Sequence, residues 1–177
     1  MGDPEKLSLA YKAKRTTVQT SLIVLGVAFE MASKWSSDLQ AEIKDWEDGR
    51  VVSLGVLPDG PYMSVKKEGG RLHYLGKGPR DAHLKILFKN MEVAFLILTG
   101  MMGAVQAFAE HRAIVHGSVD HAMEVNRAMA IVQKYLFPAF ILKKAMKRPP
   151  TYTMNDWLCR VRVNLMLGAA ILLNISK

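Results

Sequence analysis

Apolar residues near the start of the chain recur with the period of a helix. Between residues 17 and 47 they are spaced alternately by three and four positions, which predicts one long helix with a single apolar face: Val18, Leu22, Leu25, Phe29, Ala32, Leu39, Ile43 and Trp46. Thr16 or Thr17 is a suitable cap, and Asp48-Gly49 predicts the end. The stripe favours a helix laid across a sheet, and its 3.5-residue period leaves a coiled coil as an alternative.

After Gly49 the apolar positions alternate, which is typical of strands with one buried face. Four strands are predicted: residues 51–57, the segment around Met63 and Val65, the segment around Leu72 and Tyr74, and residues 82–88. Pro58-Asp59-Gly60-Pro61 predicts a tight reversal, and Glu68-Gly69-Gly70 predicts a hairpin turn. Because the connections are short, we expect these strands to form an antiparallel meander with one apolar and one mixed face.

Helical spacing returns in the second half of the chain. Helices are predicted over residues 90–98, 104–110, 118–137, 140–146 and 155–175, with a fifth strand at residues 113–116. Pro138 ends or kinks the third of these helices, because it lacks an N–H and clashes with the preceding turn. Strands and helices are segregated, so the predicted fold class is α+β: a five-stranded, mostly antiparallel sheet covered on one face by helices, with long N-terminal and C-terminal helices.

No segment rich in Gly, Ser or Pro divides the chain, so a single domain is expected. Its predicted parts are an N-terminal helical extension that packs on the domain (residues 1–47), a core (residues 48–148) and a C-terminal basic and apolar helix (residues 149–177). Pro149-Pro150 is the best joint between the last two parts.

The positive charge is concentrated at one end of the chain. The formal net charge of the 177 residues is +8. Residues 141–177 contain a single acid, Asp156, against seven basic residues: Lys143, Lys144, Lys147, Arg148, Arg160, Arg162 and Lys177. These flank an uncharged run over residues 163–175, which is too short to span a bilayer. A basic flank beside an apolar helix predicts transient contact with an anionic membrane surface and argues against nucleic acid as a partner.

Candidate catalytic and metal-binding residues do not form a recognisable site in the sequence. His111, His116 and His121 are five apart, which matches neither a helical zinc pair nor one face of a strand. His73 and His83 fall on the mixed face of the predicted sheet, where they can approach each other across strands, but no further metal ligands accompany them. Cys159 is the single cysteine, which suits a reducing, cytoplasmic compartment. No enzyme activity, cofactor or metal is therefore predicted.

One stretch of the chain resembles the sterol carrier protein family, a small lipid-binding and lipid-transfer module. The matching region runs from about Asp48 to Tyr135. Its most specific part is a glycine, an alanine-phenylalanine pair, a strand that ends in glycine and a helix that opens with an alanine-methionine pair: Gly100, Ala107-Phe108-Ala109-Glu110, Ile114-Val115-His116-Gly117-Ser118-Val119 and Ala122-Met123.

The resemblance implies a five-stranded sheet covered by helices, with an apolar tunnel between the two layers. It also implies a non-enzymatic lipid carrier whose ligand is a lipid, a sterol-like molecule or a fatty acyl chain. The residues that would line or border the tunnel are Phe95, Leu98, Met102, Phe108, Met129 and Val132. The chain departs from the family at Glu110-His111-Arg112, where members commonly have a small, lysine-rich turn. It ends without the Ser-Lys-Leu that directs proteins to peroxisomes.

Two other functions stay open at the level of sequence. An interaction module that forms a homodimer through the helix at 17–47 or at 155–175 fits the 3.5-residue period and the uncharged terminal run. An enzyme that acts on a lipidic acyl substrate would depend on His73, His83 and Cys159 beside an apolar pocket. Neither alternative is excluded by the pattern of residues alone.

Overall fold

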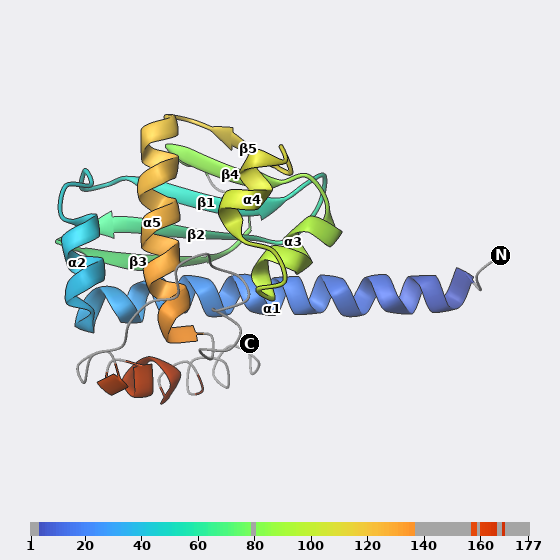
Figure 1. Cartoon of the computed structure of the whole chain (residues 1–177), viewed down its shortest axis with the longest axis horizontal. Helices are drawn as coiled ribbons and strands as arrows, with labels where there is room; N and C mark the ends of the chain where they lie inside the picture. Colours follow the sequence, from blue (N-terminus) through green and yellow to red (C-terminus); the bar gives the residue numbers. More distant parts are fainter. Residues whose placement is uncertain (1–3, 79–80, 137–156, 159, 166–167, 169–177) are drawn as a thin grey trace.

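The computed structural model describes residues 4–78, 81–136, 157–158, 160–165 and 168. Its elements follow one another in the order α1 (Pro4–Trp35), α2 (Ser37–Ile43), β1 (Val51–Val56), β2 (Tyr62–Glu68), β3 (Arg71–Lys77), β4 (Leu84–Phe88), α3 (Met91–Leu98), α4 (Ala104–Ala109), β5 (Ala113–His116) and α5 (Val119–Leu136) (Figure 1). The predicted α+β class is confirmed, since the strands gather in one sheet and the helices form a separate layer.

Within the described residues the strands form one sheet in the order β3-β2-β1-β4-β5. β1 pairs with β4 in parallel, and the other three pairings are antiparallel. The prediction of a mostly antiparallel sheet is therefore confirmed. The prediction of a four-stranded meander is correct for β1, β2 and β3 and wrong for β4, which returns to the free edge of β1.

The outer edge of β3 is occupied by α1, which explains why β4 pairs with β1. The hydroxyl oxygen of Ser33 accepts a hydrogen bond from the backbone N–H of Leu72 at 3.1 Å, and Oε2 of Glu30 accepts from the N–H of Tyr74 at 3.0 Å. Side chains of the helix thus satisfy donors that would otherwise be free at a sheet edge. A further strand cannot use these donors.

The predicted helix over 17–47 is two helices, and the prediction of one is wrong. The break lies at Ser36, which has an extended backbone and caps α2 by accepting from the N–H of Leu39 at 3.2 Å. The same hydroxyl is bonded to the hydroxyl of Tyr135 on α5 at 2.8 Å. The apolar spacing does not reveal the break, because Ala32 and Leu39 are seven residues apart and stay in phase across it.

The apolar stripe of α1 is buried inside this chain. Val18, Leu22, Leu25 and Phe29 are at most 3% exposed and belong to the main core. By length and composition the segment Leu9–Trp35 is also sufficient to cross a membrane, but half of its most apolar window is buried within the protein. Packing in the core accounts for the apolar character of the stripe.

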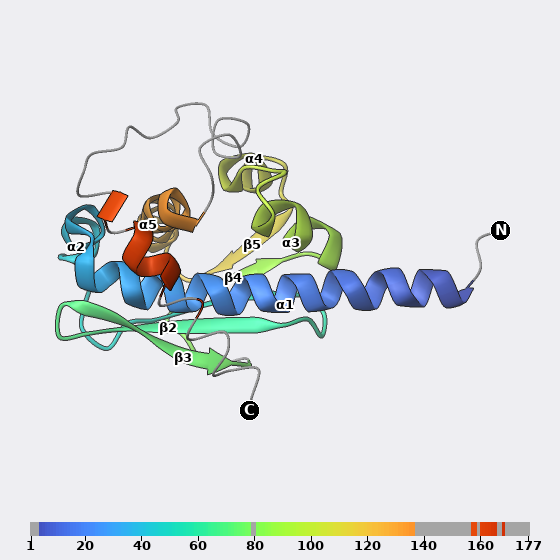
Figure 2. The same ribbon diagram turned by 90° about the horizontal axis from the view of Figure 1, so that it is seen from below.

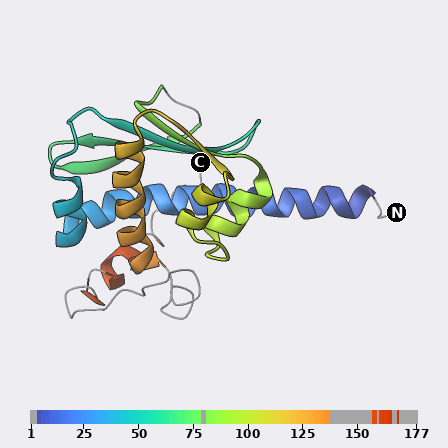
Figure 3. The ribbon, with the colours of Figure 1, turned by 45° about the horizontal axis from the view of Figure 1, so that its top comes forward.

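All described helices lie on one side of the sheet (Figures 2 and 3). On this side each strand places alternate apolar residues in the core, as Leu54, Val65 and Ile86 illustrate with exposures of 0–2%. The predicted helix at 155–175 is described only in part, and residues 157–158, 160–165 and 168 are helical. The predicted segment at 140–146 lies outside the described residues.

Candidate functional site

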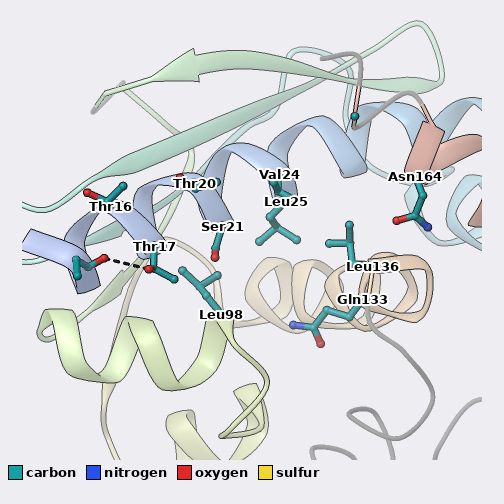
Figure 4. Close-up of a pocket in the computed structure, with 12 residues that line it drawn as sticks. Thr16, Thr17, Thr20, Ser21, Val24, Leu25, Leu98, Gln133, Leu136 and Asn164 are labelled. Atoms are coloured by element: carbon teal, nitrogen blue, oxygen red, sulfur yellow. Dashed lines mark hydrogen bonds between the residues drawn. The ribbon is translucent and has the colours of Figure 1, made fainter. Parts of the chain in front are cut away.

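A groove lies between the helices on the covered side of the sheet (Figure 4). Its volume is about 890 Å³. The described residues that line it come from α1, the end of α3, the end of α5 and the helical residues near the C-terminus: Ala13, Thr16, Thr17, Thr20, Ser21, Val24, Leu25, Leu98, Gln133, Leu136, Asn164 and Gly168. The groove is thus formed by segments that are far apart in the sequence.

One helix contributes more than half of the described lining. On α1 the lining residues are spaced by three or four positions or are neighbours, so they form a stripe beside the buried one. The stripe changes character along its length. It is hydroxyl-bearing from Thr16 to Ser21 and aliphatic at Val24 and Leu25. Figure 4 shows Leu136 opposite Leu25 and Leu98 beside Thr17 and Ser21, so apolar side chains line both parts of the groove.

The hydroxyl groups of the stripe differ in their hydrogen bonding. Thr16 and Thr17 each donate to a backbone carbonyl one turn earlier at 3.0 Å, which leaves them only as acceptors. Thr20, Ser21 and Gln133 have no hydrogen-bond partner in the described part of the chain. Figure 4 shows Ser21 on α1 and Gln133 on α5 on either side of the space between these helices. These two side chains can bond to a polar group of a bound molecule.

Every described lining residue is uncharged. Asn164 is fixed in place, since its Nδ2 donates to the carbonyl oxygens of Arg160 and Tyr135 at 2.8 and 3.2 Å. The groove therefore offers an apolar surface together with neutral donors and acceptors. Such a site can hold an apolar molecule and orient one uncharged polar group.

Of the residues predicted to line a tunnel, Leu98 lines this groove. Met129 and Val132 are buried in the core. Gln133 and Leu136, each one turn later on the same face of α5, border the groove. Phe95, Met102 and Phe108 are partly buried and pack against the core. The lipid-binding role of these six residues and the tunnel itself stay predictions.

Sequence reasoning missed the hydroxyl stripe of Thr16, Thr17, Thr20 and Ser21. Its signal was present, because these residues share a helix face next to the apolar stripe. Hydroxyl residues on a helix are ordinarily assigned to solvent, however, and only the positions of α3 and α5 turn this face into the wall of a groove.

Two of the six residues predicted to contact membranes are described. Arg162 is exposed and Arg160 is half-buried. Lys143, Lys144, Lys147 and Arg148 lie outside the described residues. Large apolar side chains beside the two arginines are exposed: Trp157, Leu158, Val161 and Leu165, with exposures of 60, 47, 37 and 70%.

The structure separates the residues of the predicted enzyme alternative. His73 lies on β3 and His83 directly precedes β4, so β2 and β1 lie between them. The prediction that they approach each other is therefore wrong, because β4 pairs with β1 and not with β3. Cys159 lies outside the described residues. Among the described residues no group of three or more His, Cys, Asp or Glu side chains could hold a metal ion.

No family model and no curated protein matches this sequence. The solved structures that it resembles include sterol carrier protein domains, the family that the sequence also resembles. A crystal structure of sterol carrier protein 2 is 15% identical with a TM-score of 0.48, and the match covers 63% of this chain and 92% of that chain. A Thermus thermophilus protein suggested to be a sterol carrier protein is 14% identical with a TM-score of 0.48, covering 63% and 85%.

A third structure is sterol carrier protein 2 from Aedes aegypti in complex with palmitate. It is 17% identical with a TM-score of 0.37, and the match covers 59% of this chain and 94% of that chain. These likenesses concern the arrangement of elements. The function of this chain is argued from its own residues.

Proposed function

We propose that this protein is a non-enzymatic lipid carrier, and that the groove between α1, α3 and α5 holds an elongated apolar molecule with an uncharged polar end. The observation that carries the proposal is the lining of the groove. Four aliphatic side chains, Val24, Leu25, Leu98 and Leu136, line it together with the unpartnered side chains of Ser21 and Gln133. A volume of about 890 Å³ is within the range of small-molecule sites.

Burial of the apolar part supplies the binding free energy in this proposal. Each CH₂ group moved from water to an apolar site contributes about 0.8 kcal/mol, so a chain of a dozen carbons binds without specific polar contacts. The polar end adds selectivity. Desolvating an ionised carboxylate against uncharged side chains is costly, whereas a hydroxyl or ester can exchange hydrogen bonds with Ser21 and Gln133.

Two fluorescent probes of equal chain length test the proposal: a labelled fatty alcohol and the corresponding fatty acid. We expect the dissociation constant of the alcohol to be at least about tenfold lower than that of the ionised acid. Each 1.4 kcal/mol that the desolvation of the unpaired carboxylate costs weakens binding by a factor of ten. Ser21→Trp and Gln133→Trp fill the groove from opposite walls and should abolish binding of both probes. Ala130→Trp, on the exposed face of α5 outside the groove, is the matched control.

Thermal denaturation of each variant shows whether it is folded. Unchanged binding in folded Ser21→Trp and Gln133→Trp proteins would contradict the proposal. An equal loss of probe binding in the Ala130→Trp protein would mean that the substitutions damage α5 in general. That result would also contradict the groove as the binding site. A preference for the ionised acid would retain a lipid site but overturn the role given to its neutral lining.

We further propose that the C-terminal helical residues contact an anionic membrane during loading. Trp157 and Leu165 are exposed apolar side chains next to the exposed Arg162, and Asn164 of the same segment lines the groove. Aromatic and aliphatic side chains beside arginine suit the interface of an anionic bilayer. A membrane contact at this segment would therefore lie at the entrance of the proposed site.

Sedimentation with vesicles tests this step. Phosphatidylcholine vesicles with about 30% phosphatidylserine should bind the protein more tightly than pure phosphatidylcholine vesicles. The expected difference in binding free energy is on the order of 1 kcal/mol for each basic residue near the surface. Combining Trp157→Ser with Leu165→Ser should reduce binding. Val119→Ser removes an equally exposed apolar side chain at the start of α5 and should have no effect. Equal binding by all three proteins would overturn the proposed contact.

A further inference from the structure

A row of polar side chains crosses four strands on the face of the sheet opposite to the helices. The pairing registers place Ser64 beside Ser53, Ser53 beside Lys85, and Lys85 beside His116. Because side chains alternate along strands, these residues point away from the core that their neighbours Leu54, Val65 and Ile86 occupy. The row is therefore independent of the groove between the helices.

A pocket of about 530 Å³ lies over part of this row. Its described lining residues come from β1, β2, β4, β5 and the residues just before β4 and just after β5: Ser53, Tyr62, Ala82, His83, Lys85, Leu87, His116 and Gly117. Three of these, His83, Lys85 and His116, bear side-chain nitrogen atoms. None of the described lining residues bears a negative charge, so the pocket combines a cation with several hydrogen-bond donors.

The hydrogen bonding of His83 fixes which of its nitrogen atoms can donate. The backbone N–H of Val51 donates to Nδ1 of His83 at 3.1 Å. Since Nδ1 is an acceptor, Nε2 carries the ring proton and is a donor. The hydroxyls of Ser53 and Ser64 share one hydrogen bond of 2.6 Å, so one of the two hydroxyl protons is free for another acceptor.

The ammonium group of Lys85 is only weakly neutralised. Its partner is the carboxylate of Asp81, with 4.0 Å between Nζ and Oδ1, and the side chain of Asp81 is fully exposed. An exposed ion pair at this distance has little stability. An anion in the pocket can therefore compete with Asp81 for Lys85.

The two histidine-bearing segments are held close together by a glycine. Gly117 has φ of +125°, and a Cβ atom at this position would lie 2.7 Å from the backbone oxygen of His83. Only glycine fits both the backbone conformation and the close approach. His83 and His116 are thus positioned by backbone packing before any ligand arrives.

We propose that this pocket binds a phosphate group, with Lys85 as the cation and His83, His116 and Ser53 as hydrogen-bond donors. A point charge surrounded by N–H and O–H donors is the chemistry that recognises phosphate oxygens. The phosphate group can belong to free inorganic phosphate or to a phospholipid headgroup. The experiment below distinguishes these two sources.

Chemical-shift titration of the full-length, ¹⁵N-labelled protein at constant ionic strength tests the proposal. One arm uses inorganic phosphate, with sodium chloride as the reference salt. The other uses short-chain phosphatidic acid below its micelle concentration, with short-chain phosphatidylcholine as the reference. We expect saturable shifts of the Ser53, Lys85 and His116 amides in at least one arm. Saturation by phosphate identifies a free anion as a ligand, and saturation by phosphatidic acid alone identifies a headgroup.

Variants assign the effect to the pocket. K85Q and H116N should each weaken binding about tenfold, as expected for the loss of charge-assisted hydrogen bonds. D81N should strengthen it, because it removes the competing carboxylate of Lys85. H73N is the matched control, since His73 lies on β3 and outside the pocket. The absence of saturable shifts in both arms would overturn the proposal, and so would an equal loss of binding in H73N.

Discussion

The two faces of the sheet carry different chemistry on the same strands. Toward the helices, Leu54 and Ile86 are buried in one continuous core, and the open space on that side is a groove with neutral walls. On the other face their immediate neighbours Ser53 and Lys85 belong to a polar row with a small basic pocket. Strand alternation alone assigns a residue to one face or the other. The covering helices decide which face must be apolar.

The largest expected effect contrasts two adjacent residues of β4. Ile86→Ala should reduce the free energy of unfolding by about 3 kcal/mol, because a fully buried aliphatic side chain is lost and a cavity remains. Lys85→Ala, one position earlier on the other face, should change it by about 0.5 kcal/mol or less. Urea denaturation followed by circular dichroism measures both. Similar losses would contradict the assignment of the two residues to different faces.

A smaller effect is expected where α1 covers the edge of β3. Ser33→Ala leaves the buried N–H of Leu72 without its acceptor and should cost about 2 kcal/mol. Hydrogen exchange at the Leu72 amide should accelerate more than exchange at amides bonded within the sheet. Ser37→Ala, an exposed serine at the start of α2, is the control and should leave both quantities nearly unchanged.

The smallest effect concerns Tyr74, whose hydroxyl is buried without a hydrogen-bond partner in the described part of the chain. Tyr74→Phe should raise the free energy of unfolding by about 1 kcal/mol, because it removes an unsatisfied polar atom. Thermal denaturation at neutral pH measures the change. Destabilisation by Tyr74→Phe would indicate that the hydroxyl has a partner.

The same residue predicts a dependence on alkaline pH. Burial raises the pKa of Tyr74 above its ordinary value. In the unfolded chain the phenol ionises at pH about 10, whereas in the folded protein it stays protonated to higher pH. The ionisation of Tyr74 therefore does not affect stability below pH about 10, and it lowers the free energy of unfolding as the pH rises from there toward the folded pKa, because the unfolded chain loses the proton first. Tyr74→Phe should reduce the loss of stability measured between these pH values.

The candidate groove was predictable only in part. Leu98 was predicted to face an apolar cavity and does line the groove. Met129 and Val132 were predicted with it; they lie one turn before Gln133 and Leu136 on the same face of α5 and are buried in the core. Ser21 was visible in the sequence only as part of the hydroxyl stripe, and Gln133 gave no signal, since each is an ordinary surface residue until the other helix lies opposite.

The sequence by itself determined the α+β class and the kind of most described elements, although the helical residues 4–16 of α1 were not predicted. Hydrophobic periods of 3.6 and 2 depend only on local geometry, so they predict the strands and most helices correctly. The tertiary structure decided which strands pair and where the first helix ends. β4 joins β1 because Glu30 and Ser33 occupy the edge of β3, and α1 ends at Trp35 because Ser36 bonds to Tyr135 on α5. Such choices depend on competition between groups distant in the sequence, and no local period records that competition.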